Sequence, residues 1–391
     1  MARGIILLLI YALLLAAATL VEKFAGPTAA RIILYYSPLL ILLPVALVVN
    51  FIAVAIKLNK PRWSFLFIHG ALMVILTGAL VTHIWSKEGT IHLREGQSAN
   101  QMISQTNRGS QTHSLPFCIE LQEFNVTFYS GTSQPSSFES ILIIHQEGTA
   151  VKKSISVNKF LDIKGYRLFQ ASYDRDEKGS VLLVNKDIPG RQITYLGYML
   201  LIIGFILFFV SKSSRISILY SKRIIVFVII VLFVGALLFV SQIGRFNPKV
   251  TLLAPVLKSR WLVFHVGTIV VAYLCFGICF LLGILNLITK KVKSTGIILE
   301  ISLWIGLCFM TTGTFLGAVW ANESWGRYWG WDPKETWALI TIIIYTVVTH
   351  SSFVKKANPK RLYIYSIIAF ICVIITYFGV NYFLSGMHSY R

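Results

Sequence analysis

The most constraining feature of this sequence is a recurring apolar run of about twenty residues, the length of helix that crosses a bilayer. Hydrophobic residues make up 55% of the 391 residues and charged residues only 13%, and the mean hydropathy is +0.70. These values exclude an ordinary soluble protein and predict a mainly α-helical membrane protein, a polytopic bundle of transmembrane helices. We expect nine spans, near 5–21, 33–56, 64–85, 192–210, 224–242, 261–288, 297–319, 338–354 and 362–384.

The first of these runs resembles a secretory signal peptide, because Arg3 precedes it. No clear small-residue cleavage site follows the run, and it is long enough to span a bilayer. We therefore expect it to remain as a membrane anchor.

The basic residues of the short connections predict how the helices are oriented, because lysine and arginine concentrate on the cytoplasmic side. One set of connections has no acidic residue, whereas the opposite set also holds Glu22, Glu323, Asp332 and Glu335. The stretch 243–260 is the exception, since it is basic and falls in the second set. We expect a multi-pass protein of a bacterial inner membrane, with a cytoplasmic N-terminus and an extracytoplasmic C-terminus. The basic residues of the first set are Arg3, Lys57, Lys60, Arg62, Lys212, Arg215, Lys222, Arg223, Lys290, Lys291, Lys293, Lys355, Lys356, Lys360 and Arg361.

The net charge of +20 is explained largely by this asymmetry and by attraction to anionic headgroups, so membrane lipids are expected partners. No stripe of basic and aromatic residues indicates nucleic acid binding. The five cysteines include no CxxC pair, so neither a structural zinc site nor a dithiol redox site is indicated.

A long polar region at 86–190 interrupts the apolar runs and predicts a small extracytoplasmic domain. Alternating stretches such as 140–145, separated by turns that contain glycine, are typical of antiparallel strands. The region shows no metal-ligand spacing and no nucleophile–base pair, which favours a binding or structural role. The chain is thus expected to comprise membrane helices at 1–85, a β-rich domain at 86–190 and a second membrane domain at 191–391.

The segment 320–337, WANESWGRYWGWDPKETW, holds five of the nine tryptophans of the chain. Tryptophan combines a large flat apolar surface with one N–H group. An interfacial belt accounts for one or two tryptophans at a helix end, but this density, interleaved with glycine, favours a platform for a flat aromatic ligand. Asp332 followed by Pro333 also predicts the start of a helix. The tryptophans are Trp320, Trp325, Trp329, Trp331 and Trp337.

The run WGRYWGWDPKETWALI closely resembles the tryptophan-rich "WWD" signature of the haem-handling proteins of cytochrome c biogenesis, and especially the CcsA branch of the System II synthase. GTIHLREG at 89–96, LPFCIELQEF at 115–124 and KGYRLFQASYDRD at 164–176 resemble the ResB/CcsB family, the partner to which CcsA is often fused. KDIPG at 186–190 departs slightly from the Asp-Pro pattern of that family. The resemblance implies a fused CcsB-like and CcsA-like protein.

Two histidines are expected at the same depth in the half of the bilayer nearer the cytoplasm. His69 lies seven residues after Arg62 and His350 lies five before Lys355, one to two helical turns from the basic side. An ionisable residue within a span indicates function, and two neutral imidazoles suit an iron ligated on both faces. The pair therefore predicts a haem site within the membrane.

A second pair is expected on the opposite side. His265 lies five residues after Arg260, and His388 follows the last span. His83 also lies near that end of its span and competes for the same role, although the span boundary already explains a polar residue there. The remaining histidines are expected on the surface of the β-rich domain: His92, His113 and His145.

The resemblance implies the same ligands. His265 in RWLVFHVGTIVVAY and His388 in SGMHSY resemble the outer haem ligands of the family. His350 in ALITIIIYTVVTH resembles its membrane ligand, and His69 in FIHGALMVILTGAL resembles the membrane ligand of the CcsB half.

The resemblance also implies a cytochrome c synthase of the haem lyase type. Haem b would pass from the inner to the outer histidine pair, where the two thiols of an apocytochrome c CxxCH segment add to its vinyl groups. The chain would supply no catalytic residue of its own, and a thiol-reducing partner would fit this chemistry. The residues expected to bind haem are Trp325, Trp329, Trp331, Asp332 and Trp337, with Arg327 and Lys334 near its propionates.

Three other functions remain open from the sequence. The chain would serve as a haem transporter or chaperone if a separate synthase attached the haem. A di-haem electron-transfer subunit is a second alternative, although it would place both histidine pairs within the bilayer. A structural scaffold without haem is the third.

Overall fold

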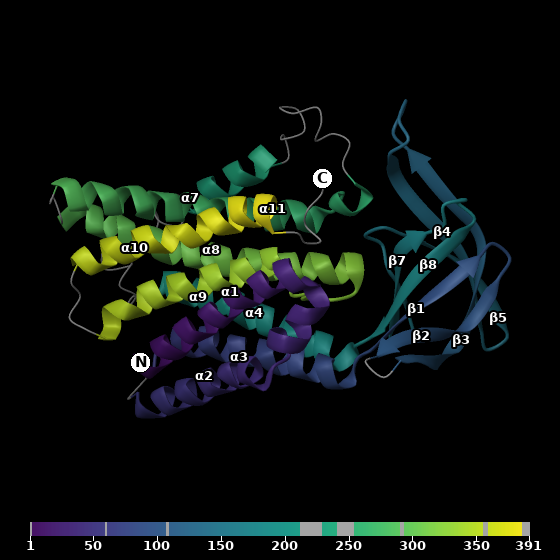
Figure 1. Ribbon diagram of the computed structural model, residues 1–391, viewed down its shortest axis with the longest axis horizontal. Coiled ribbons are helices and arrows are strands. Elements are labelled where there is room, and N and C mark those ends of the chain that lie inside the picture. The colour runs from purple at the N-terminus through teal and green to yellow at the C-terminus, as the bar shows by residue number, and fades with distance from the viewer. Residues whose placement is uncertain are drawn as a thin grey trace.

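The computed structural model describes residues 2–58, 61–106, 109–211, 229–240, 254–289, 293–354 and 359–384. A bundle of long helices carries a β domain at one end (Figure 1). Seven stretches are long and apolar enough to cross a bilayer, which confirms a polytopic membrane protein. They are Ala2–Tyr35 (α1 and η1), Pro38–Lys57 (α2), Trp63–Trp85 (α3), Ile188–Val210 (α4), Arg260–Thr289 (α7), Thr295–Trp325 (in α8, Lys293–Trp325) and Lys360–Phe383 (in α10, η4 and α11).

The other two expected spans also fall on helices. The range 338–354 lies within α9, Pro333–Val354. The range 224–242 is described only in part, as the apolar helix Ile229–Val240. The last span consists of α10 (Pro359–Ile374), the π-helix η4 (Ile375–Gly379) and α11 (Val380–Phe383).

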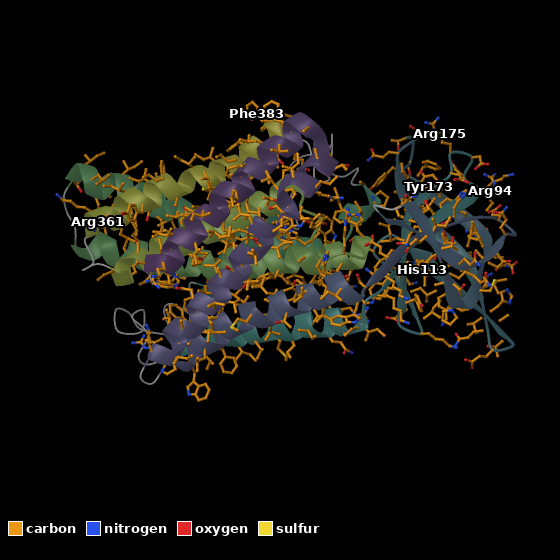
Figure 2. All side chains as sticks on the ribbon, turned by 60° about the horizontal axis from the view of Figure 1, so that its bottom comes forward. Arg94, His113, Tyr173, Arg175, Arg361 and Phe383 are labelled. Atoms are coloured by element: carbon orange, nitrogen blue, oxygen red, sulfur yellow. The ribbon has the colours of Figure 1, made fainter. Side chains whose placement is uncertain are left out.

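The surface of the bundle is apolar. Side chains such as Leu13, Phe24 and Ile56 are largely exposed, with Ile56 retaining 80% of its accessible area. Such a surface is unfavourable in water and favourable against lipid tails. Arg361 lies at the end of the bundle remote from the β domain (Figure 2).

Helices α3 and α4 enter and leave the β domain and pack closely against each other. A row of glycines on α4 makes this possible, since a Cβ atom on Gly197 would lie 3.0 Å from the backbone nitrogen of Ile75. Small residues at a helix interface let backbones approach within a membrane. The close packing of α4 against α3 fixes the position of α3 and therefore that of His69.

Replacing Gly197 with leucine is expected to destabilise this helix pair by about 1–3 kcal/mol or more, because the added side chain meets backbone atoms that cannot move aside. Gly277→Leu on α7 is the matched control, since no heavy atom lies within 4 Å of its Cβ position. Thermal unfolding of both variants in the same detergent measures the effect. Equal melting temperatures for the two variants would contradict the close approach.

The β domain is one antiparallel sheet of eight strands in the order β5-β4-β3-β2-β1-β8-β7-β6. Its alternating buried side chains, among them Ile119, Leu142 and Leu182, form a single apolar core. The sheet curls into a barrel-like shape that brings β4 and β7 face to face, where the hydroxyl of Ser140 donates to Gln170 Oε1 at 2.6 Å. The strands are β1 Lys87–Arg94, β2 Ser98–Thr106, β3 Gly109–Phe128, β4 Pro135–Gln146, β5 Thr149–Ser156, β6 Leu161–Ile163, β7 Tyr166–Tyr173 and β8 Gly179–Lys186.

The KDIPG sequence joins the sheet to α4. Asp187 is the N-cap of the helix, and its Oδ1 accepts from the backbone N–H of Gly190 at 3.1 Å. Its Oδ2 accepts from the hydroxyl of Thr82 at the end of α3, at 2.7 Å. One buried carboxylate therefore caps α4 and joins it to α3 where both meet the sheet.

Candidate functional site

The tryptophan-rich segment connects α8 to α9 at the end of the bundle that carries the β domain (Figure 1). Asp332 is buried and caps α9 as the sequence predicts, accepting from the backbone N–H of Lys334 at 2.9 Å. Glu335 completes a capping box, because its carboxylate accepts from the N–H groups of Asp332 at 3.3 Å and Gly330 at 2.8 Å. The start of α9 thus fixes the backbone of the preceding loop.

Trp331 adopts the left-handed backbone conformation, with φ 57°. This conformation costs a residue other than glycine about 1–3 kcal/mol, so contacts with the surrounding residues must stabilise it. The face of its ring stacks on Tyr35 with centroids 4.7 Å apart and an interplanar angle of 20°. Trp329 meets it at 86° from another direction, with centroids 5.9 Å apart.

The helix α1 (Ala2–Ala30) and the π-helix η1 (Arg31–Tyr35) lie against this segment. The helical geometry is broken at Gly26, which has φ 86° and ψ 165° and stands before Pro27, so this stretch consists of helical pieces joined by a kink. The expected span 5–21 covers only the first part of this stretch. The remainder extends toward the tryptophan-rich segment, where Arg31 Nη2 donates to the carbonyl of Gly330 at 3.2 Å.

The five tryptophans have different surroundings. Trp320 is 1% exposed and belongs to the interior, in contact with Trp325 at a centroid distance of 4.8 Å. Trp337 packs on α1, and its indole N–H donates to Thr19 Oγ1 at 3.2 Å. The buried indole N–H of Trp329 has no hydrogen-bond partner in the described part of the chain. An unsatisfied buried donor costs about 1–3 kcal/mol, so this N–H group fits the acceptor atom of a ligand.

The two basic residues expected near the propionates are placed differently. Lys334 donates to Asn381 Oδ1 on α11 at 3.0 Å, and burial lowers the pKa of its ammonium group against the opposing effect of Asp332. Desolvation raises the pKa of the Glu88 carboxyl at the start of β1, and the positive charge of Arg327 partly opposes this shift.

His69 on α3 and His350 on α9 lie next to each other near the end of the bundle remote from the β domain. Their ring centroids are 6.1 Å apart and their planes are inclined by 79°. An iron about 2 Å from one nitrogen of each imidazole would require a similar separation of the rings. Phe51 on α2 stacks on His69 with centroids 5.1 Å apart, so an aromatic wall flanks the pair.

Backbone contacts define which nitrogen of each ring carries the lone pair. His69 Nδ1 lies 2.9 Å from the carbonyl oxygen of Phe65, and His350 Nδ1 lies 2.9 Å from that of Thr346. Each Nδ1–H group therefore donates to a carbonyl one helical turn earlier, and the lone pair of the neutral ring is on Nε2. Histidine ligands of metals commonly use this arrangement.

His265, near the start of α7, packs on the backbone of α8. Its Nδ1 lies 2.7 Å from the carbonyl oxygen of Gly313, so Nε2 again carries the lone pair. A Cβ atom on Gly317 would lie 2.8 Å from the ring, and this glycine therefore makes room for the imidazole. The expected partner, His388, lies outside the described residues.

Three of the other histidines have contacts of another kind. His92 and His145 on the β domain pair through Nε2 with Asp174 and Glu120, each at 3.0 Å. His83 is exposed and stacks on Tyr36 with centroids 6.4 Å apart. His92 and His145 therefore use Nε2, the nitrogen that carries the lone pair in His69, His350 and His265. His83 instead makes its contact through an exposed ring.

The β domain contacts the start of the tryptophan-rich segment directly. Asn185 donates to the carbonyl of Gly326 at 2.6 Å, and Ser324 donates to Asn158 at 2.6 Å. Gly326 has φ 73°, and an added Cβ atom would lie 2.8 Å from the ring of Phe169. Only glycine meets both requirements, so the segment and the sheet are joined at a fixed position.

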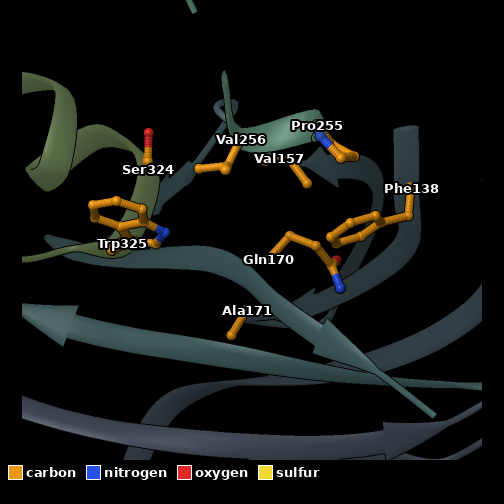
Figure 3. Close-up of a pocket in the computed structure, with 8 residues that line it drawn as sticks. All are labelled: Phe138, Val157, Gln170, Ala171, Pro255, Val256, Ser324 and Trp325. Atoms are coloured by element: carbon orange, nitrogen blue, oxygen red, sulfur yellow. The ribbon is translucent and has the colours of Figure 1, made fainter. Parts of the chain in front are cut away.

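A pocket of about 210 Å³ lies at this junction, between Trp325 on one side and Phe138 on the other (Figure 3). Pockets that enclose drug-sized ligands measure about 300–1,000 Å³. The pocket is therefore too small to enclose a haem, and the tryptophan-rich segment itself is the better candidate for that contact.

Comparison with known proteins identifies the family of this chain. Residues 191–388, half of the chain, match the family described as cytochrome C assembly protein. The chain belongs to this family. Residues 53–187 of this cytochrome c assembly protein match the ResB-like family, so the two parts are fused in one chain. A role in cytochrome c maturation follows from membership.

Several relatives of this assembly protein are similar over part of their length. It is 40% identical to Protein NrfI of Wolinella succinogenes over 176 residues, which covers 41% of this chain and 19% of the relative. It is 37% identical to the cytochrome c biogenesis protein CcsA of Chlamydomonas reinhardtii over 150 residues, which covers 35% of this chain and 42% of the relative. The chain thus spans less than half the length of either relative.

The family boundaries give the inner histidine pair a further meaning. His69 belongs to the ResB-like part and His350 to the assembly part, so the pair joins the two. Arg31 and Tyr35 precede both matched regions, and sequence reasoning did not find them. Their contacts lie about 300 residues away in the chain, and no local pattern signals them.

Proposed function

We propose that this cytochrome c assembly protein carries haem across the membrane and attaches it to apocytochrome c. The observation that carries this proposal is the proximity of His69 and His350, 6.1 Å apart between ring centroids, on helices from the two fused parts. Both rings present Nε2 as the acceptor nitrogen. This arrangement suits a planar iron cofactor held between two helices of a bundle.

Haem is the cargo rather than a resident cofactor in this proposal. It enters at the end of the bundle remote from the β domain and is held by the inner pair. It then reaches His265 and His388, with Trp325, Trp329 and Trp331 beside it. The indole N–H of Trp329 and the side chains of Arg327 and Lys334 are donors for its propionates.

Attachment needs positioning more than chemical groups from this chain. Each thiol of the substrate CxxCH segment adds across one haem vinyl group, so that an S–C bond forms and the proton ends on the other vinyl carbon. The addition involves no net oxidation or reduction. Holding thiols and vinyl groups in contact supplies a large part of the lowering of such a barrier.

The deciding experiment expresses the chain with an apocytochrome c in cells that lack other maturation systems. We expect covalent haem on the substrate, detected by haem staining after denaturing electrophoresis. Substrate without covalent haem, together with haem bound to the purified chain, would contradict attachment and favour the transporter or chaperone. The absence of low-spin haem from a folded chain would contradict both.

A further inference from the structure

We propose that the N-terminal segment Thr19–Tyr35 is a built-in clamp of the tryptophan-rich platform, and that Tyr35 is the positioning residue for Trp331. This inference rests on the proposed function only for the identity of the ligand, haem. The clamp precedes both matched family regions, which begin at residues 53 and 191. Neither matched region therefore accounts for it.

Three side chains of the clamp contact three points of the platform. Arg31 donates to the carbonyl of Gly330 at 3.2 Å, and the ring of Tyr35 stacks on Trp331 at 4.7 Å. Thr19 accepts from the indole N–H of Trp337 at 3.2 Å. The contacts thus hold the loop at the carbonyl of Gly330 and at the ring face of Trp331. They also hold the first turns of α9 at Trp337.

Tyr35 is itself held on several sides. It is 2% exposed, and its hydroxyl lies 3.4 Å both from Glu22 Oε2 and from Thr336 Oγ1. It ends the π-helix η1, in which the N–H of Tyr36 donates to the carbonyl of Arg31 at 2.9 Å. The wider turn presents Arg31 and Tyr35 to the same loop.

Trp331 requires such a clamp because its backbone is in the left-handed region, with φ 57°. A site for a planar ligand must be held within about 0.5 Å of its productive geometry by residues whose own positions are fixed. Tyr35 covers one ring face of Trp331, and Trp329 approaches it nearly at a right angle. Loss of the Tyr35 ring would release Trp331 without removing a group that touches haem.

The test compares Tyr35→Leu, Tyr35→Phe and the control Tyr36→Leu in the full chain. Tyr36 is the neighbouring residue and is exposed, so its loss removes a ring without touching the platform. We expect Tyr35→Leu to lower covalent haem attachment by about fivefold, which corresponds to the free energy of one lost aromatic contact. Tyr35→Phe keeps the stacked ring and should stay within about twofold of the original chain. Equal losses in Tyr35→Leu and Tyr36→Leu would overturn the proposal.

A double-mutant cycle shows whether Tyr35 acts through Trp331. If it does, Tyr35→Leu should lower attachment little further in a Trp331→Leu background, because residues in contact are not additive. Fully multiplicative losses would overturn the positioning role.

The near-UV circular dichroism of the haem-free chain separates this inference from the proposed function. Tyr35→Leu and Trp331→Leu should remove the same band, and Tyr36→Leu should leave it. If the chain attaches no haem but the variants show these band changes, the proposed function is contradicted and the clamp is supported. An unchanged band in Tyr35→Leu would contradict the clamp alone.

Discussion

Replacing His350 with alanine is expected to lower covalent haem attachment by at least about tenfold, since even outer partners of metal ligands contribute about 10–100-fold. His69→Ala should have the same effect, because the two rings lie 6.1 Å apart and are proposed to hold one iron. The measurement is the yield of haem-bearing cytochrome c per amount of membrane-inserted chain. Added imidazole should restore part of the activity by entering the space that the ring leaves.

His83→Ala is the matched control for these variants. His83 is on the same helix as His69 and is exposed, and its ring stacks on Tyr36 with centroids 6.4 Å apart. Its loss is expected to leave attachment unchanged. A His350→Ala variant as active as His83→Ala would contradict the inner haem site, whatever the state of the outer one.

Replacing Gly326 with valine is expected to separate the β domain from the tryptophan-rich segment. The backbone there has φ 73°, where a β-branched residue is a rare outlier. The new side chain would also meet Phe169 at 2.8 Å and Leu183 at 3.0 Å. Strain and overpacking each cost about 1–3 kcal/mol, so the sum is large for one site. We expect greater protease sensitivity of the β domain and a severalfold loss of attachment.

Gly131→Val separates the two causes. Gly131 has φ 75° in a turn of the β domain, and nothing lies within 4 Å of its Cβ position. It therefore carries the backbone strain without the collision. If Gly326→Val and Gly131→Val lower attachment equally, the junction between sheet and platform has no role in the reaction.

Much of the architecture could be predicted from the sequence because local patterns determine it. Apolar runs of bilayer length predicted the polytopic bundle, and alternating residues such as those of 140–145 predicted the strands. Asp332 and Pro333 predicted the start of α9, since capping depends on neighbours in the chain. The ends of the helices were predicted less well. The first helical stretch, α1 with η1, reaches Tyr35, whereas its expected end was residue 21.

The candidate site could be predicted only where depth in the membrane restricts position. Counting residues from Arg62 and Lys355 placed His69 and His350 at one level, and the structure places the rings side by side. Depth says nothing about which helices are neighbours. The contacts of Thr19, Arg31 and Tyr35 with residues about 300 positions away depend on the packing of α1 against α9, which no local pattern determines. The different environments of the five tryptophans have the same origin.

The absorption spectrum of the purified His265→Ala variant tests the central claim most directly, because removal of the outer ligand leaves the inner pair as the proposed haem site. We predict that this variant retains the bands of a low-spin haem with two imidazole ligands. The further change His350→Ala should abolish them. Identical spectra with and without His350 would contradict a haem held between the two fused parts of the chain.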